Sequence, residues 1–502
     1  MISALYDPLF QAVRMDGSKV TLGLKPLLIQ AHTLKDLSAR TPTGRCALMR
    51  LCIAFLTEVY KPRDAEARRE IFESGAFDGT RIEEYIQECE ANGPRFLLDD
   101  ERHPFMQAAY EEKLDAKALK PVAALFADLP SGNNHIHLEH RLQDEYEMDA
   151  DQAFEAMMET YLFCPASLLG PSGCNNTPPL YALLRGRSLF ETLALNMVSI
   201  QELGNIPLGE GEVPWRMETV IQPRKQVNEI SFLQALTWQP RRLTLIFDAD
   251  GKVRKVYLQA GLDFRGNSGW EDPHVSYFLK KDGTWGTLKP ELGRQVWRDA
   301  GMLMATRSTS ERPPIPVTNL GDVWWDPDEN WKISMDVIGM ITDQATLMGW
   351  LHERLVLPQC LLCDESRAEE FKLYVQRTNE LHAQVKYGID KLIYEIKKGT
   401  SSIAQQAGEL FLQEMHEFLF GRCLEQIMDQ PVFGQERQGR LEDFWKKAWY
   451  ALNDVWIRVV EKSGFSIREI KRQNQARGWV MHEYKRLREK DGVEWKKEED
   501  QA

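Results

Sequence analysis

The last third of the chain contains four long amphipathic segments and few residues that break helices. The first segment places apolar residues three and four positions apart, the spacing of one helix face: Phe371, Tyr374, Val375, Leu381, Val385, Ile389, Leu392 and Ile396. The four segments cover about residues 367–398, 402–430, 437–461 and 466–490. Four helices of about 25 to 30 residues, joined by short turns, predict an up-down four-helix bundle.

Turn and capping residues separate the four segments. Gly399 stops the first one, because glycine readily adopts the left-handed conformation that ends a helix. Ser401 or Ser402 can cap the second segment, and Ser466 can cap the fourth, through side-chain oxygens that accept from free backbone N–H groups. The second segment ends before Pro431, which cannot continue a helix.

The chain before residue 360 has a different character. Short apolar runs typical of strands, at residues 242–247 and 255–260, alternate with helical patterns at 44–60 and 149–163. The turn FDADGKV, residues 247–253, carries Asp-Gly at its tip, which favours a β-hairpin. This part of the chain therefore mixes helices and strands.

We predict an α+β fold with two parts. Residues 1–362 form a large mixed domain with small β-sheets and long loops, and residues 363–502 form the C-terminal four-helix bundle. The length of 502 residues lets each part bury its own core. No window approaches about eighteen uncharged apolar residues, and the N-terminus lacks a signal-peptide pattern, so we expect a cytoplasmic protein with no membrane partner.

The eight cysteines are scattered along the chain. Only Cys360 and Cys363 form a CxxC pair, and a zinc ribbon needs a second such pair. We therefore expect reduced thiols that are mostly buried, and we predict no bound metal and no cofactor.

The formal net charge of −13 argues against indiscriminate binding of nucleic acid, because phosphate binding depends on lysine and arginine. Local basic stretches nevertheless occur at residues 222–226, 239–243 and 252–255. The fourth C-terminal segment is also basic, and its candidate contacts to a DNA backbone are Arg468, Lys471, Arg472 and Arg477. A solvated basic face is the other interpretation of these residues.

The stretch SGNNHIHLEH, residues 131–140, concentrates histidines. In an extended chain His135, His137 and Glu139 lie on one face, and His140 lies on the other. One hypothesis is a metal-dependent nuclease that uses these four residues, and the other is a loop that binds RNA or a neighbouring subunit. No second ligand cluster and no Walker, GxSxG or HExxH motif supports an enzyme, so we predict no catalytic residue.

Four short stretches resemble one known family, in this order along the chain: HPFMQ (103–107), SGNNHIHLEH (131–140), TWQPRRL (237–243) and VIGMITDQATLMGWLHE (337–353). The chain is thus similar to the CasA family, the large subunit of the type I-E CRISPR surveillance complex Cascade. The chain length and the predicted C-terminal bundle fit the same family, so the resemblance covers nearly the whole chain.

The resemblance implies a non-catalytic function. Such subunits recognise a protospacer-adjacent motif in double-stranded DNA and help to open the duplex, so that the guide RNA can pair in an R-loop. They also recruit a separate helicase-nuclease. The implied partners are the other Cascade subunits, the guide CRISPR RNA, double-stranded target DNA and the helicase-nuclease, with no metal and no cofactor.

The last of the four stretches also has a local interpretation. Gly339 permits a turn, which leaves Met340 and Ile341 at a loop tip. Thr342 or Asp343 can then cap a following helix. An apolar loop tip can enter between base steps of DNA, and the ordinary start of a capped helix is the alternative.

The resemblance also implies roles for individual residues. Those implied to recognise the DNA motif are the loop glycines Gly170 and Gly173, the basic residue Arg265, and the wedge Gln344 with its neighbours Asp343 and Ala345. Arg254 and Lys255 are further candidates for the basic residue. Those implied to contact guide RNA or a neighbouring subunit are Asn133, Asn134, His135 and His137.

Overall fold

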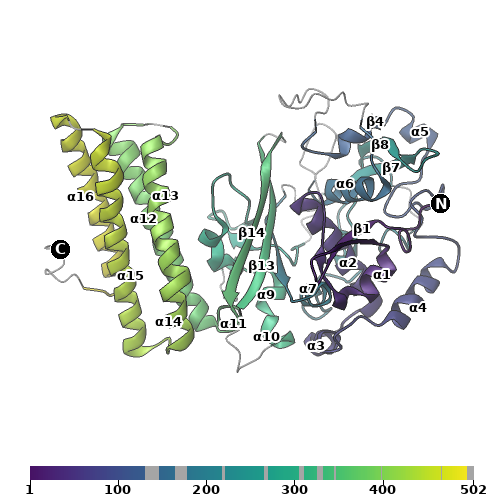
Figure 1. Ribbon diagram of the computed structural model, residues 1–502, viewed down its shortest axis with the longest axis horizontal. Coiled ribbons are helices and arrows are strands. Elements are labelled where there is room, and N and C mark those ends of the chain that lie inside the picture. The colour runs from purple at the N-terminus through teal and green to yellow at the C-terminus, as the bar shows by residue number, and fades with distance from the viewer. Residues whose placement is uncertain are drawn as a thin grey trace. The chain divides into compact units, whose positions relative to one another are not determined.

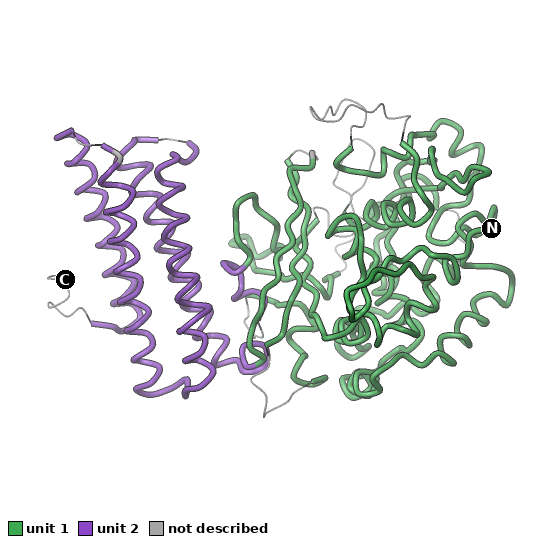
Figure 2. Tube along the Cα trace, viewed as in Figure 1, with its two compact units in different colours: residues 1–296, 307–359 green, residues 297–306, 360–502 purple. Residues whose placement is uncertain are grey.

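The computed structural model of the protein describes residues 1–129, 146–163, 178–217, 221–264, 270–304, 310–324, 332–343, 346–396, 398–464 and 466–494. The chain divides into two compact units (Figure 2). Unit 1 contains residues 1–296 and 307–359, and unit 2 contains residues 297–306 and 360–502. None of the described helices is long and apolar enough to cross a membrane.

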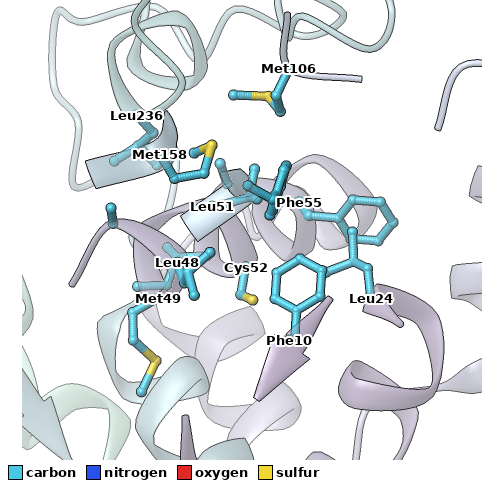
Figure 3. Packing of buried hydrophobic residues seen from close by; sticks show 14 of the residues in the cluster. Phe10, Leu24, Leu48, Met49, Leu51, Cys52, Phe55, Met106, Met158 and Leu236 are labelled. Carbon is cyan, nitrogen blue, oxygen red and sulfur yellow. The ribbon is translucent and has the colours of Figure 1, made fainter. Parts of the chain in front are cut away.

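Unit 1 is built around one buried helix, α2 (Pro42–Tyr60). Every residue from Thr43 to Val59 is buried, so side chains on all faces of the helix contact protein. Thr41 caps the N-terminus by accepting from the Gly44 N–H at 2.9 Å. Figure 3 shows apolar side chains of the surrounding core, including Phe10, Leu24, Leu51, Phe55 and Met158. The helix predicted over residues 44–60 is confirmed.

The other helices of unit 1 are shorter. They are α1 (Leu24–Ile29), α3 (Ala65–Glu73), α4 (Gly79–Glu90), α5 (Glu112–Asp115), α6 (Ala150–Leu162), α7 (Leu189–Asn196), α8 (Phe232–Leu236), α9 (Ile315–Thr318) and α10 (Leu320–Val323). Helix α6 begins with a capping box, in which the Asp149 side chain accepts from the Gln152 backbone and the Gln152 side chain accepts from the Asp149 backbone. The helix predicted over residues 149–163 is therefore confirmed.

The strands of unit 1 form small sheets, as predicted (Figure 1). One sheet has the order β2–β1–β3, from β1 (Phe10–Arg14), β2 (Lys19–Leu22) and β3 (Leu34–Leu37). A second has the order β4–β8–β7, from β4 (Leu119–Pro121), β7 (Arg241–Phe247) and β8 (Val253–Ala260). A third has the order β11–β10–β12, from β10 (Tyr277–Leu279), β11 (Trp285–Thr287) and β12 (Glu311–Arg312), and β6 (Gln226–Val227) pairs with β9 (Asp263–Phe264).

Strands β7 and β8 form the hairpin predicted from the Asp-Gly turn. The Asp248 N–H donates to the Lys252 carbonyl oxygen at 2.8 Å, which closes the turn. Gly251 has a φ of 76°, a conformation that glycine adopts without steric cost. The predicted hairpin is confirmed.

Two of the motifs that carried the family resemblance contact each other in unit 1. Gln239 of TWQPRRL donates from Nε2 to the Met106 carbonyl oxygen of HPFMQ at 2.9 Å. Gln107 of HPFMQ accepts on Oε1 from the Leu245 N–H of β7 at 2.7 Å. Phe105 is 1% exposed and lies in the core. These residues join a loop to β7, which gives both motifs a role in stabilising the fold.

The remaining sheet of unit 1 has the order β14–β13–β5, from β5 (Tyr181–Arg185), β13 (Lys332–Asp343) and β14 (Thr346–Pro358). Figure 1 shows β13 and β14 as one long hairpin. The predicted turn at Gly339 and the predicted helix after Thr342 or Asp343 are therefore wrong, because Gly339, Met340 and Ile341 pair along β14 as strand residues.

The predicted C-terminal four-helix bundle is present in unit 2. Its helices are α12 (Glu365–Tyr387), α13 (Ser402–Phe418) with α14 (Leu424–Asp429), α15 (Gly434–Val455) and α16 (Ile467–Lys490), and α11 (Gln359–Cys363) precedes them. Gly399 has a φ of 85° after the first helix, and Ser401 accepts from the Ala404 N–H at 3.1 Å. Ser466 forms a capping box with Glu469. The two serine caps expected from the sequence are thus confirmed, whereas the first helix and its π turn end at Ile393, before the predicted stop at Gly399.

Three of the long helices contain a wider π turn that the sequence did not predict. These segments are η5 (Gly388–Ile393), η6 (Leu419–Cys423) and η7 (Trp456–Val460). Helix α12 lies beside α13 and α16, and α13 lies beside α15. The rings of Trp445 and Tyr484 lie 5.4 Å apart, which joins α15 to α16 and closes the bundle.

Unit 2 also contains a segment from much earlier in the chain, within η4 (Val296–Leu303). Arg298 donates from Nε to Asn379 Oδ1 at 2.8 Å, and Asn379 donates from Nδ2 to the Arg298 carbonyl oxygen at 2.8 Å. The Trp297 ring lies 5.3 Å from the His416 ring. Helices α12 and α13 thus hold this segment by reciprocal hydrogen bonds and ring contacts.

Candidate nucleic-acid interface

The β13–β14 hairpin extends past the third strand of its sheet. Strand β5 pairs with β13 only from Ser334 to Ile338. Beyond Ile338, no third strand among the described residues pairs with β13, while β13 and β14 stay paired up to Asp343 and Thr346. At about 3.3 Å per residue, the five residues from Gly339 to Asp343 span roughly 17 Å. The hairpin therefore continues as a two-stranded ribbon, in which Gly339 and Met340 are buried, Ile341 and Thr342 are half-buried and Asp343 is exposed.

A buried ion-pair cluster lies at the base of this ribbon, and we call it the Asp336 hub: Asp36, Arg45, Arg185, Asp336, His352 and Arg354. Asp336 is 1% exposed and accepts on Oδ2 from Arg45 Nη2 at 2.8 Å and from Arg185 Nη1 at 3.0 Å. Its other oxygen accepts from Arg354 Nε at 3.0 Å. The hub therefore joins β13 to α2, β5 and β14.

Asp36 on β3 is the second carboxylate of the Asp336 hub. It accepts on Oδ1 from Arg45 Nη2 at 3.0 Å, and it also pairs with Arg185. His352 of β14 places Nε2 3.4 Å from Asp336 Oδ1. Two carboxylates thus face three guanidinium groups, which leaves the cluster with one excess positive charge.

The charges of the hub keep Asp336 ionised. Burial by itself raises the pKa of a carboxyl group, because a charge is poorly solvated inside protein. Here the hydrogen bond from His352 and the charges of Arg45 and Arg185 outweigh burial and hold the pKa of Asp336 well below its ordinary value. The hub therefore stays intact across the physiological pH range.

The glycine of the hairpin has a packing role. A Cβ atom on Gly339 would lie 2.7 Å from Leu180 Cδ2 and 3.0 Å from Pro290 Cγ. Gly339 is the first residue of β13 past the pairing with β5. Close packing against neighbouring segments, rather than a turn, therefore favours glycine there.

Asp343 is the one predicted motif-reading residue within the described residues. It is exposed, pairs with Thr346, and ends β13. The other predicted contacts to the DNA motif, guide RNA or neighbouring subunits lie outside the described residues: Asn133, Asn134, His135, His137, Gly170, Gly173, Arg265, Gln344 and Ala345. Glu139 and His140 of the nuclease hypothesis lie outside them as well.

Two of the three basic stretches of unit 1, residues 239–243 and 252–255, contain internal ion pairs, whereas Arg224 and Lys225 of the stretch 222–226 are exposed. Arg242 is 1% exposed and pairs through Nη2 with Asp115 Oδ2 at 2.8 Å. Arg254 pairs with Glu147 and with two aspartates of its own turn. Lys255 is exposed on β8. The stretch 239–243 is therefore structural, and of the two described candidates for the basic residue Lys255 is the more available.

The four predicted DNA-backbone residues of α16 fall into two groups. Arg472 donates from Nη1 to the Ile393 carbonyl oxygen at 3.1 Å and pairs with Glu395. Arg477 donates from Nη2 to Asn453 Oδ1 at 2.7 Å. Arg468 and Lys471 are exposed, and the structure gives them no ion pair with any described residue. The second group is therefore the more available to an external phosphate.

The Asp336 hub was not predicted from the sequence. Its one signal is a single acidic residue inside the apolar run KISMDVIGM, where an isolated carboxylate would be costly to bury. The partner Arg45 lies 291 residues away in the chain. A lone acid in a buried strand indicates a distant cation, but it does not identify which one.

Metal-binding chemistry was searched in the described residues only. No group of three or more histidine, cysteine, aspartate or glutamate side chains there could hold a metal ion. Burial raises the pKa of the Cys46 and Cys52 thiols to about 12, and raises that of Cys360. These thiols are thus poor nucleophiles and poor metal ligands at neutral pH.

Comparison with known proteins gives one family. The sequence profile of the family described as CRISPR-associated protein Cse1 matches residues 5–453. A comparison with curated proteins finds no match.

Solved structures share the fold over nearly the whole chain. Thermus thermophilus CasA (Cse1) is 20% identical, with a TM-score of 0.73, covering 97% of this chain and 100% of its own. Thermobifida fusca Cse1 is 19% identical, with a TM-score of 0.77, covering 97% and 98%. A chain of a structure described as a CRISPR RNA-guided surveillance complex is 19% identical, with a TM-score of 0.80, covering 96% and 99%.

Proposed function

Since the chain belongs to the family of CRISPR-associated protein Cse1, we propose that it is the non-catalytic large subunit of a type I-E CRISPR Cascade complex. In this function it recognises a protospacer-adjacent motif in double-stranded DNA and helps to unwind the duplex. The guide RNA then pairs with one DNA strand in an R-loop, and this pairing supplies the sequence specificity. The surveillance-complex chain with the same fold supports such an assembly.

The two-stranded β13–β14 ribbon, which ends at the exposed Asp343, is the observation that carries the proposal. A ribbon of about 17 Å that has no third strand is narrow enough to reach into a duplex. Gln344 and Ala345 follow the exposed Asp343 in the sequence and lie outside the described residues. We assign Gln344 as the wedge, with Asp343 and Ala345 beside it.

A wedge offsets the cost of unstacking DNA through new contacts. Separating one base step costs a few kcal/mol, and a side chain inserted between the bases recovers part of that cost. The ribbon must therefore be held firmly at its base, because a loosely held wedge would lose entropy on insertion. The buried Asp336 hub supports this requirement.

Two further loops complete the motif-reading surface in this proposal. Gly170 and Gly173 let the backbone approach the minor groove, where a Cβ atom would collide. Arg265 supplies the basic contact, with Lys255 as the described alternative. Minor-groove edges distinguish mainly A·T from G·C pairs, so the subunit tolerates several related motifs.

The remaining contacts are to the rest of the complex. Asn133, Asn134, His135 and His137 dock onto the guide RNA or a neighbouring subunit, using amide hydrogen bonds and ring stacking. Arg468 and Lys471 on the exposed face of α16 attract the DNA backbone. Helix α16 begins after residue 453, where the family profile ends, so this contact rests on the exposure of its cations. A separate helicase-nuclease is recruited to the DNA-bound complex.

The substitution Gln344→Ala tests the wedge. In a complex reconstituted with the full chain, we expect motif-dependent DNA binding to weaken by about tenfold, equivalent to about 1.4 kcal/mol, because the unstacked step loses its inserted side chain. Binding should be titrated on duplexes that carry every possible adjacent motif. Gln376→Ala, which removes an exposed glutamine from α12, is the matched control and should change nothing.

The same titration includes an outcome that would contradict the proposal. Equal motif-dependent binding by the Gln344→Ala and wild-type complexes, or by complexes that lack this chain, would contradict it. The nuclease hypothesis makes the opposite prediction for the purified chain, namely stoichiometric zinc or manganese together with intrinsic cleavage of DNA.

A further inference from the structure

The two-stranded ribbon magnifies small rotations of the sheet from which it extends. The distal residues of β13 lie up to about 17 Å from the last pair with β5. A rotation of about 5° at the base would move such a tip by roughly 1.5 Å, half the length of a hydrogen bond. The contacts that orient the ribbon at its base would therefore also determine where its far end meets DNA.

Two kinds of contact hold the base of the ribbon. Ile338 and Met340 are buried in the core of unit 1 and contribute apolar packing. Apolar contacts are non-directional, so they fix how deep a strand lies better than they fix where it points. Charge-assisted hydrogen bonds have preferred lengths and angles, and they therefore restrict rotation.

The Asp336 hub supplies those directional contacts at the right place. Its bonds to Arg45, Arg185 and Arg354 run to α2, to β5 and to the other strand of the hairpin. Asp336 pairs with Arg354 across the hairpin, two positions before the β5 pairing ends at Ile338. The hub thus lies within the three-stranded part of the sheet, just before the two-stranded ribbon begins, and it bonds both strands of the hairpin.

We propose that the Asp336 hub is the positioning element of the hairpin, which sets the direction of the ribbon so that its turn meets DNA in one register. This inference rests on the function proposed above for Gln344. Asp336, Arg45 and Arg185 then determine discrimination among adjacent motifs although they contact no DNA. They act through the geometry of β13 and β14, and Asp336 is the central group because each arginine bonds it.

The test compares two carboxylate-to-amide substitutions in unit 1. Asp336→Asn removes the charge of the hub, and Glu202→Gln removes a carboxylate that pairs with the buried Arg68 on α3. In the reconstituted complex we measure the ratio of affinities for the preferred and the poorest adjacent motif. We expect this ratio to fall about tenfold in Asp336→Asn, about 1.4 kcal/mol, and to stay unchanged in Glu202→Gln.

A milder variant keeps the test informative if Asp336→Asn does not fold. Arg354 is 48% exposed, so Arg354→Lys removes the Nε donor to Asp336 while keeping the positive charge. We expect about a threefold loss in the affinity ratio and no change in affinity for DNA without a motif. Amide hydrogen exchange should accelerate at residues 337–343 in both hub variants and not in Glu202→Gln.

The outcomes separate this inference from the proposed function. If Gln344→Ala lowers the affinity ratio while Asp336→Asn and Arg354→Lys leave it intact, the hub is only a stabilising cluster and the inference is wrong. If Gln344→Ala has no effect, the wedge proposal itself is contradicted. An equal fall of the ratio in Glu202→Gln would also overturn the inference, because any loss of stability would then suffice.

Discussion

In the bundle, Glu370 on α12 pairs with Arg440 on α15 at 2.8 Å, and both side chains are almost fully buried. In unit 1, Asp336 collects arginines from α2, β5 and β14 in one cluster. The bundle pair crosses the bundle core between two helices that both lie beside α13, next to the stacked rings of Tyr374 and Phe444 at 4.9 Å, so it mainly selects their register. The Asp336 hub instead joins β13 to three other elements at one point. In our proposal, similar charges then serve alignment in one unit and direction in the other.

The largest effect on stability is expected at the hub. Asp336→Asn removes the anion that Arg45, Arg185 and Arg354 all bond and leaves Arg45 and Arg185 with Asp36 alone. Removing one partner of a buried pair costs about 3 to 5 kcal/mol. We expect a loss of about 5 kcal/mol in the free energy of unfolding, measured by urea denaturation. A loss below about 1 kcal/mol, which is typical of an exposed ion pair, would contradict the stronger role that we give to the hub.

Glu370→Gln in the bundle should cost less. Arg440 keeps its bonds to Gln430 Oε1 at 3.1 Å and to the Pro431 carbonyl oxygen at 2.9 Å, so its charge is not left without acceptors. We expect the free energy of unfolding to fall by about 3 kcal/mol, the lower end of the range for a broken buried pair. Urea denaturation measures this loss. If Glu370→Gln lowered the free energy of unfolding more than Asp336→Asn does, the expected order of the two substitutions would be wrong.

The pH dependence of stability offers a third comparison. His274 in unit 1 is fully buried, and burial together with the Arg50 charge lowers its pKa from 6.5 to about 4. Between these two pH values the unfolded chain binds a proton that the folded chain does not, so stability is lost as pH falls. We expect about 2 kcal/mol of this loss between pH 7 and pH 5.

The measurement must isolate His274 from other groups. Burial raises the pKa of Glu155 to about 7, which gives the opposite pH dependence between pH 4.5 and 7. The unfolding free energies of wild type and His274→Gln should therefore be compared at both pH values, and their difference should shrink at pH 5. His416→Gln in the bundle should show a smaller change, because that histidine is only partly buried.

The smallest effect is expected at a helix cap. Ser466→Ala removes the side-chain oxygen that accepts from the Glu469 N–H at 3.2 Å and should destabilise the bundle by about 1 kcal/mol. Ser402→Ala is the control, because Ser402 is exposed in the first turn of α13 and Ser401 makes the cap. Thermal unfolding of both variants checks this, and equal melting temperatures would contradict it.

The bundle was predictable because its information is local. Apolar residues recur at helical spacing within each segment, and Ser401 and Ser466 mark the starts of two helices. The four motifs in order also identified the family, which the profile over residues 5–453 confirms. The π turns were not predictable, because one extra residue per turn leaves the apolar pattern almost unchanged.

The hairpin was misread for a physical reason. Strand β13 is buried on both faces from Met335 to Met340, so its sequence lacks the alternation that normally indicates a strand. Gly339 was therefore taken for a turn, although close packing explains it. The Asp336 hub depends on partners from distant parts of the chain, and a single sequence does not reveal such pairings.

The order in which the chain is synthesised gives the Trp297–Arg298 segment a further consequence. These residues leave the ribosome before any helix of the bundle and must wait for Asn379 and His416 to be made. A fragment that starts at residue 360 would lack them and would expose the surface they cover on α12 and α13. Dissecting the protein at that boundary would therefore yield a bundle with an unfilled side, prone to self-association.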